Sequence, residues 1–383
     1  MNRASEPIDV PAHVGSVLRD AVSAGATASA VYAAAIAGEA QEPVAVGAAL
    51  RFGDQGTELP AGDQVPATPE TFYDLASITK LFTAITALSL VADGSLALDE
   101  PVGEHLAQYR DADKAGVNLR HLLTHTSGLP AEWSGWRSRF GSGRGFHRGE
   151  LLADLLDTGL LAAPGSRFEY SCIGYNTVMA LCEARSGMPW AALVQDRVLD
   201  HLPTTGITGR PEPGHCAATE FRPDLGRGMI RGSAHDEAAW SLGGLSGNAG
   251  MFATAPALLV FAEALRTGLE GILPAGLAAE MWQAQVSEAL LPGEDRQQPD
   301  FGQGLGLRIG QRSWMGARAS SGAVADRPRG HGGFTGTSLL IDKTQGISIA
   351  LLANQVHPSR TGPGIQPTCR EIVETVYRTV LPG

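Results

Sequence analysis

The clearest pattern of apolar and polar positions lies in residues 77–93, where apolar side chains recur every three or four positions. This spacing places them on one face of a helix, and Gly94 follows as a helix stop signal. The apolar face consists of Ile78, Leu81, Phe82, Ile85 and Leu88. The pattern therefore predicts an amphipathic helix that packs against a core.

Strand-like apolar runs stand near both ends of the chain, and helical patterns fill the middle. Strands are predicted at 29–38, 43–53, 301–310, 336–343 and 347–355. Helices are predicted at 11–25, 116–125, 149–160, 174–186, 189–200, 255–267 and 369–381, with irregular stretches at 133–147 and 203–235. This order predicts an α/β (α+β) fold whose sheet uses both termini. We expect residues 1–83 and 296–383 to form the sheet domain, residues 84–295 an inserted helical domain, and the active site to lie in the cleft between them.

The charge and composition of the 383-residue chain narrow its partners. A formal net charge of −11 argues against nucleic acid or an anionic membrane as the main partner. The N-terminal segment lacks the apolar region of a signal peptide, and the apolar run 28–38 is too short to span a bilayer. We therefore expect a cytoplasmic protein that acts on small molecules and whose scattered cysteines are free thiols.

The beginning of the predicted helix at 77–93 carries a candidate nucleophile and base. The chain has only three lysines among 29 basic residues, and Lys80 follows Ser77 by three positions. Residues at this spacing share a helix face, about 5–6 Å apart at Cβ. A lysine can take the proton of a serine if burial and neighbouring positive charge lower the lysine pKa. The motif alone also fits an exposed lysine beside an incidental serine, and Asp74 could either cap the helix or pair with Lys80.

Further segments accompany this motif in one order along the chain: DLASITK (74–80), HLLTHTSGLP (121–130), PGSRFEYSCIGYN (164–176), GNAGMFATAPALLVFAEAL (247–265), HGGFTGTS (331–338) and LLANQVHPSR (351–360). Together they resemble the serine β-lactamase and penicillin-binding-protein superfamily, in its class C-like branch of esterases, D-aminopeptidases and transacylases. The resemblance covers most of the chain. It implies a β-lactamase-like fold, in which helices flank an antiparallel sheet.

The resemblance also implies a role for each matched group. Ser77 is the nucleophile that becomes acylated, and Lys80 holds or takes its proton. Tyr170 is the partner base, which passes the proton to the leaving group and activates the incoming nucleophile. His331 orients Tyr170 or a substrate carboxylate. The backbone N–H groups of Ser77 and Phe334 form the oxyanion hole.

Some of the matched positions bear on substrate choice. Cys172 stands where lactamases have an asparagine that grips a substrate amide, which weakens a β-lactam or peptide interpretation. Asn176 could partly replace that amide, and a second nucleophile at Cys172 is a further alternative, although no histidine lies near it in sequence. His331 stands where lactamases have a lysine. A histidine is only partly charged at neutral pH, so it should bind a substrate carboxylate more weakly. Gly332 and Gly333 would let a substrate lie close to their strand.

An aromatic loop early in the helical domain is a candidate for substrate binding. It contains Trp133 and Trp136, followed by Phe140 and Phe146. We predict that this loop roofs the cleft and selects the acyl group. The alternative is a satellite core beneath a loop. No metal or organic cofactor is implied, because the histidines of HLLTH lack the adjacent glutamate of a zinc-binding helix.

These patterns predict a serine hydrolase or acyltransferase that acts through an acyl-enzyme on an ester or thioester of a small metabolite. The acyl acceptor would be water or a second metabolite. A D-stereospecific amidase or aminopeptidase, or a β-lactamase, is the alternative within the enzyme class. A non-catalytic homologue that binds a ligand through the cleft is the alternative from another class. The joint presence of Ser77, Lys80 and Tyr170 argues against it.

Overall fold

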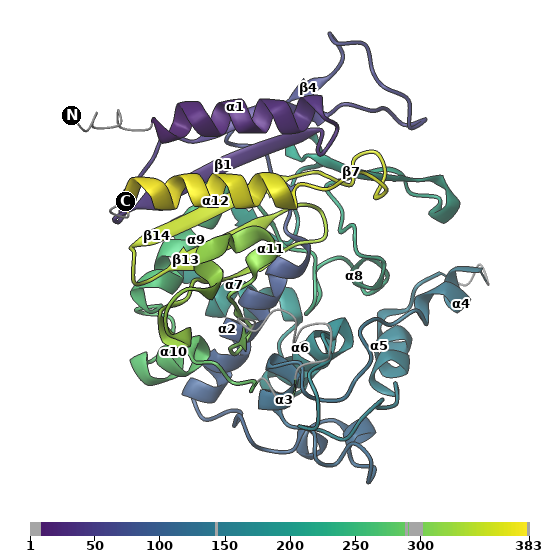
Figure 1. The fold of residues 1–383 in the computed structure, drawn as a ribbon. Helices are drawn as coiled ribbons and strands as arrows, with labels where there is room; N and C mark the ends of the chain where they lie inside the picture. Colours follow the sequence, from purple (N-terminus) through teal and green to yellow (C-terminus); the bar gives the residue numbers. More distant parts are fainter. Residues whose placement is uncertain (1–8, 142–144, 288–289, 291–301, 381–383) are drawn as a thin grey trace.

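An antiparallel sheet assembled from both ends of the chain organises the fold (Figure 1). The computed structural model describes residues 9–141, 145–287, 290 and 302–380. Within these ranges the nine-stranded sheet runs in the order β10 (Gly302–Gln303), β11 (Arg308–Ile309), β12 (Arg329–Gly332), β13 (Ser338–Asp342), β14 (Ile347–Ala353), β1 (Ser29–Ile36), β3 (Val44–Leu50) and β4 (Val65–Pro66), and β2 (Glu39–Ala40) pairs with β1. The predicted sheet from both termini is therefore confirmed.

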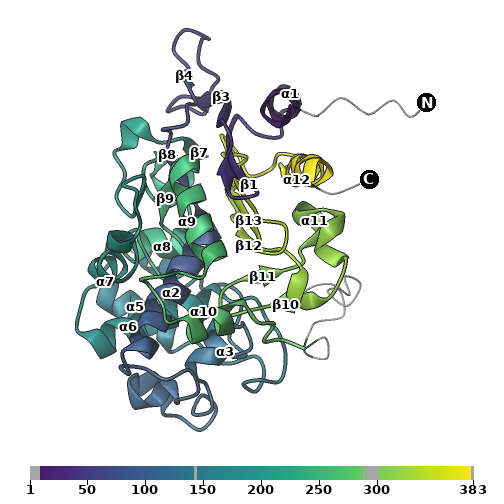
Figure 2. The same cartoon turned by 90° about the vertical axis from the view of Figure 1, so that its left-hand side faces the viewer.

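The two central strands are buried on both faces because helices cover each side of the sheet. Alternate residues of β1 enter different cores: Val31, Ala33 and Ala35 join one, and Ala30 and Tyr32 join the other. This alternation follows from the two-residue period of a strand. Helix α9 (Ala255–Thr267) packs on one face, and α1 (Val10–Ser23) and α12 (Gln366–Val380) pack on the other (Figure 2).

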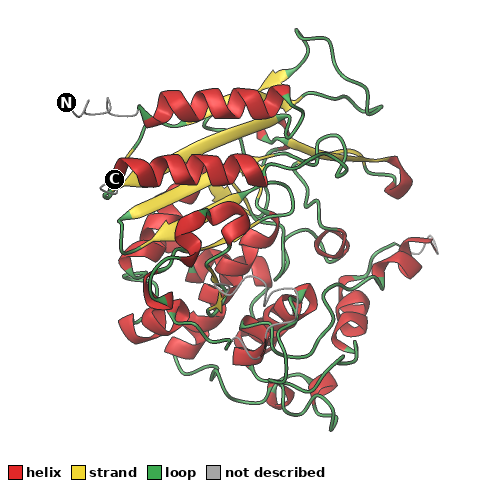
Figure 3. Ribbon diagram, viewed as in Figure 1, coloured by secondary structure: helices red, strands yellow, loops and turns green. Residues whose placement is uncertain are grey.

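Helix α11 (Arg312–Met315) lies with α12, and most of the other helices, drawn red in Figure 3, lie on the α9 side of the sheet (Figure 2). They include α2 (Thr79–Ala92), α3 (Leu119–Leu123), α5 (Arg148–Leu156), α6 (Cys172–Ser186), α7 (Trp190–Arg197), α8 (Glu237–Ser241) and α10 (Ala275–Trp282). Helix α2 lies at the centre, in contact with α6 and α7. It is buried from Thr79 to Leu90, more than one apolar face predicts. Its hydroxyl side chains tolerate this burial because they are hydrogen-bonded, as in Thr83 Oγ1 to Gly247 O (2.7 Å).

Several sequence-based boundaries differ from the structure. The helix predicted at 116–125 is only α3, and the stretch 203–235, predicted to be irregular, contains the hairpin β7 (Ala218–Arg222)–β8 (Gly228–Arg231). Helix α9 falls inside the range expected to form the helical domain, yet it packs on the sheet. No helix in the described ranges combines the length and apolarity needed to cross a membrane.

Candidate active site

A tight turn presents Ser77 at the start of α2. Ser77 lies in a short 3-10 helix (Ala76–Ile78) that follows strand β5 (Tyr73–Asp74). Asp74 braces this turn: one carboxylate oxygen accepts from Ala76 N (2.8 Å) and the other from His235 N (2.7 Å). Ala76 has φ +45°, a conformation that non-glycine residues rarely adopt and that concentrates at functional sites. Asp74 therefore caps the turn, and no hydrogen bond within the described residues joins it to Lys80.

Lys80 lies one turn further along and is fully buried. Its Nζ donates to Ser77 Oγ (3.1 Å), Asn248 O (3.1 Å) and Cys172 Sγ (3.4 Å), which uses all three ammonium hydrogens. Burial acts to lower the pKa of Lys80, whereas its interactions with Cys172 and Tyr170 act to raise it, and the net direction is upward. The condition stated for a lysine base, a lowered pKa, is therefore not met by Lys80. Lys80 rests as an ammonium ion.

Tyr170 stands beside this lysine, in the loop before α6. Lys80 Nζ lies 5.0 Å from the centre of its ring, and the guanidinium carbon of Arg308 lies 5.2 Å from the same centre. His125 packs against the ring at 4.4 Å between centroids, and its Nδ1 accepts from Ser171 N (3.0 Å). His125 therefore positions Tyr170 and its neighbouring backbone. Burial, together with the nearby charge of Arg308, lowers the pKa of His125 well below its usual range.

His331 lies on β12 and faces Tyr170, with ring centroids 6.1 Å apart. Its Nδ1 donates to Gly332 O (2.8 Å), because a carbonyl can only accept; Nε2 is therefore a bare acceptor and has no partner within the described residues. Burial, aided by the positive charges of Lys80 and Arg308, lowers the pKa of His331 to about 3. The expectation of a partly charged histidine is corrected, since His331 is neutral at pH 7.

The turn between β12 and β13 lies directly against the nucleophile turn. A Cβ placed on Gly333 would lie 2.5 Å from Leu75 O and 2.2 Å from Thr337 Oγ1, so only glycine allows this approach. Thr337 Oγ1 donates to Leu75 O (3.2 Å), which ties the two turns together. Phe334 follows in the chain, and its backbone N–H donates to no acceptor within the described residues. This arrangement supports an oxyanion hole formed by the Ser77 and Phe334 amides.

Comparison with known proteins identifies the family to which these segments belong. The family model described as Beta-lactamase matches residues 33–367, which is most of the chain. The chain belongs to the Beta-lactamase family. It is accordingly an enzyme of the β-lactamase-like superfamily, and its mixed α/β architecture is that of this fold.

Individual relatives align with most of this chain. The esterase EstB of Burkholderia gladioli is 30% identical over 345 residues, which span 78% of this chain and 81% of that protein. The structure of EstCE1, "a hydrolase with promiscuous acyltransferase activity", superposes with a TM-score of 0.73 at 25% identity and covers 96% of this chain and 98% of that one. A D-stereospecific amidohydrolase from Streptomyces sp. shares the fold, with a TM-score of 0.66 at 22% identity over 97% of this chain and 98% of its own.

The surroundings of Cys172 bear on its two alternative roles, substrate contact and second nucleophile. Cys172 begins α6, is half-buried, and accepts from Lys80. Burial raises the pKa of its thiol, although the charge of Lys80 opposes that rise, and a raised pKa disfavours the nucleophilic thiolate. Asn176 is not free to replace the missing amide, because its Oδ1 accepts from Asn248 N (3.2 Å) and the residue is buried.

The aromatic loop is packed on its own neighbours. Trp136 begins α4 (Trp136–Gly141) and is 5% exposed, and Trp133 packs partly buried against the main core. Phe146 meets Trp240 of α8 edge-on at 4.9 Å. Residues 142–144 of the loop lie outside the described residues. A role for Trp133 and Trp136 in substrate binding stays a prediction.

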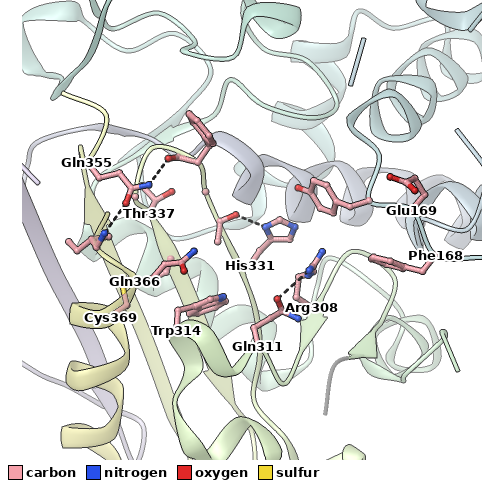
Figure 4. A pocket seen from close by; sticks show the side chains of 17 residues that line it. Phe168, Glu169, Arg308, Gln311, Trp314, His331, Thr337, Gln355, Gln366 and Cys369 are labelled. Atoms are coloured by element: carbon pink, nitrogen blue, oxygen red, sulfur yellow. Dashed lines mark hydrogen bonds between the residues drawn. The ribbon is translucent and has the colours of Figure 1, made fainter. Parts of the chain in front are cut away.

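A cavity of about 630 Å³ adjoins Tyr170 and His331. Figure 4 shows His331, Arg308 and Trp314 directed into it. Arg308 was not among the predicted site residues, since its only signal in the sequence was a charge in the glycine-rich strand segment 301–310, and His125 was not among them either. Within the described residues, no group of three His, Cys, Asp or Glu side chains has the spacing to hold a metal ion.

Proposed function

We propose that this protein is a serine-dependent acyl-transferring enzyme that forms a covalent ester at Ser77. One observation carries the proposal. The buried ammonium group of Lys80 donates to Ser77 Oγ (3.1 Å), and the centre of the Tyr170 ring lies 5.0 Å from the same nitrogen. A hydroxyl bonded to a buried cation beside a phenol is prepared to lose its proton. The donor is an ester or thioester of a small molecule.

The proposed reaction has two steps. Ser77 Oγ attacks the carbonyl carbon of the donor, its proton passes through Tyr170 to the leaving group, and the Lys80 ammonium stabilises the negative charge that develops between them. The amides of Ser77 and Phe334 hold the oxyanion. In the second step an acceptor hydroxyl, from water or another molecule, gives its proton to Tyr170 as its oxygen bonds to the acyl carbon, and Ser77 Oγ takes up that proton as its own bond to the acyl carbon breaks.

Two other functions remain as alternatives. A D-stereospecific amidase is favoured by the fold it shares with the Streptomyces amidohydrolase, but the thiol at Cys172 argues against efficient amide cleavage. A homologue that only binds a ligand would not need the contacts of Lys80 with Ser77. We take the donor and acceptor to be small molecules, in line with the net charge of −11.

Labelling with a fluorophosphonate probe tests the proposal. We expect the unmodified protein to gain the probe mass at Ser77. The Ser77→Ala variant should not be labelled at all, although its thermal unfolding midpoint should match that of the unmodified protein. Cys172→Ala serves as the control, because it removes the alternative nucleophile and should still label. Labelling that survives in Ser77→Ala and disappears in Cys172→Ala would make Cys172 the nucleophile instead.

A further inference from the structure

The cavity beside Tyr170 lies on one side of the reaction centre. Its walls come from the β12–β13 turn, from α11 (Arg312–Met315) and from the first turn of α12, and they include Tyr170 and His331. Ser77 and Lys80 are not among the lining residues. The cavity is therefore bounded by Tyr170 and not by the lysine.

Its position defines which reactant would occupy it, given the proposed function on which this inference rests. In the two-step reaction Tyr170 delivers a proton to the departing group and then takes one from the incoming acceptor. Both groups must therefore approach from the Tyr170 side. A water molecule needs about 30 Å³. A cavity of about 630 Å³ instead matches the size of sites that bind organic molecules.

The lining is suited to an uncharged ligand with a ring. Phe168, Trp314 and Ile365 contribute apolar surface, and the two ionic side chains, Arg308 and Glu169, have opposite signs. Glu169 pairs with Arg167 (2.9 Å), and Arg308 donates to Gln311 Oε1 (3.2 Å), so each ionic side chain of the lining already has a polar partner in the protein. Gln355 adds no free polar group, because its Nε2 donates to Phe334 O (2.8 Å) and its Oε1 accepts from Ile365 N (2.9 Å).

Two buried polar atoms of the lining have no partner within the described residues. One is His331 Nε2, which is a bare acceptor because Nδ1 donates to Gly332 O. The other is Gln311 Nε2, a donor whose companion oxygen accepts from Arg308 (3.2 Å). Figure 4 shows both side chains at the same cavity. A buried acceptor and donor are costly to leave unpaired, and a hydroxyl group can satisfy both kinds of atom.

We propose that this cavity binds an organic acyl acceptor, an uncharged alcohol with an aromatic body, and that the enzyme transfers the Ser77-bound acyl group to it in preference to water. The acceptor oxygen forms a bond to the acyl carbon as the bond from that carbon to Ser77 Oγ breaks. The acceptor proton passes through Tyr170 to Ser77 Oγ. The products are the acceptor ester and the free serine, so no further reactant is needed.

The experiment uses the full chain with para-nitrophenyl butyrate as the donor. A rapid burst of para-nitrophenol reports the acyl-enzyme, and mass spectrometry measures the ratio of ester to acid product. The acceptors are benzyl alcohol, ethanol and para-(hydroxymethyl)benzoate at equal concentration. We expect benzyl alcohol to give a ratio at least about tenfold above that of ethanol, and the charged analogue to fall below benzyl alcohol.

A pair of tryptophan variants links the transfer to the cavity. Trp314→Ala removes an aromatic wall and should lower the ester-to-acid ratio for benzyl alcohol about tenfold, with little change for ethanol. Trp282 lies outside the lining, so Trp282→Ala should keep the ratio of the unmodified protein. Because the ratio is taken within each variant, changes in the acylation rate cancel.

The outcomes separate this inference from the proposed function. A burst without benzyl ester, a ratio that Trp314→Ala and Trp282→Ala lower equally, or a preference for the charged analogue would overturn the acceptor site and leave the serine mechanism intact. The absence of any burst, with no labelling of Ser77, would overturn both.

Discussion

The resemblance to the β-lactamase superfamily implies that the thiol of Cys172 stands where a side-chain amide would hold the scissile amide of a substrate. A side-chain amide offers both a donor and an acceptor, whereas a thiol is weak in both roles. Here the sulfur is already in contact with Lys80 at 3.4 Å, and the nearby Asn176 is committed to the backbone of Asn248. An amide leaving group also needs more help to depart than an alkoxide does. We therefore expect the site to favour esters over amides.

Replacing this thiol tests the preference directly. We predict that Cys172→Asn raises kcat/KM for an amide relative to a matched ester by about tenfold or more, because one hydrogen bond to a transition state is typically worth about 10²–10³ in rate. Cys172→Ser is the control, since it changes the sulfur without supplying an amide. An unmodified enzyme that already prefers the amide substrate would contradict the argument.

The turn between β12 and β13 is the element that would join the two halves of the proposed oxyanion hole. Thr335 Oγ1 donates to Asp74 O (2.7 Å) and Thr337 Oγ1 to Leu75 O (3.2 Å), so two hydroxyl groups hold it against the nucleophile turn. The absence of a side chain at Gly333 is what permits this contact. The position of the Phe334 amide is therefore set by packing between two turns that are far apart in sequence.

Adjacent glycines in this turn provide a matched pair of variants. In Gly333→Ala the new methyl group would meet Leu75 O at 2.5 Å, so the turn must move and displace the Phe334 amide. We predict a loss of about 10²–10³ in kcat for an ester substrate, the usual cost of one oxyanion donor. In Gly332→Ala the nearest atoms would lie 3.9 Å away, an ordinary contact, so the loss should be much smaller. Equal activity of the two variants would argue against Phe334 as a donor.

Buried histidines make the stability of the whole molecule depend on pH. Burial lowers the pKa of His331 to about 3 and that of His357 to about 4, whereas an exposed histidine in the unfolded chain titrates near about 6.5. Below about pH 6.5 the unfolded chain therefore binds more protons than the folded one, and stability falls as pH falls. Asp74 acts in the opposite direction, because burial raises its pKa and the folded state gains its proton first.

We predict that the free energy of unfolding is lower at pH 5 than at pH 7 by about 1–4 kcal/mol, since one pKa unit corresponds to about 1.4 kcal/mol for each histidine. Urea unfolding at the two pH values measures this difference. His331→Asn removes one of the titrating groups and should make the pH dependence shallower. Equal stability of the unmodified protein at both pH values would contradict burial of the two histidines in neutral form.

Elements with strong local patterns were predictable from the sequence, and those that depend on partners were not. The apolar runs of β1 and β14 and the helix α9 follow directly from their period and caps. The hairpin β7–β8 was missed because its proline- and glycine-rich segment resembles a loop, and its residues become strands only by pairing with each other. Helix α3 is short because its predicted continuation bends at His125, which has φ +59°.

The sequence by itself determined the order of the matched segments and the three-residue spacing of Ser77 and Lys80, since both depend only on neighbours along the chain. The tertiary structure alone decided the charge state of the site. The pKa of Lys80 depends on Cys172 and Tyr170, and that of His331 on burial, Lys80 and Arg308. Burial and charge act through space, so they are set only when distant segments of the chain come together.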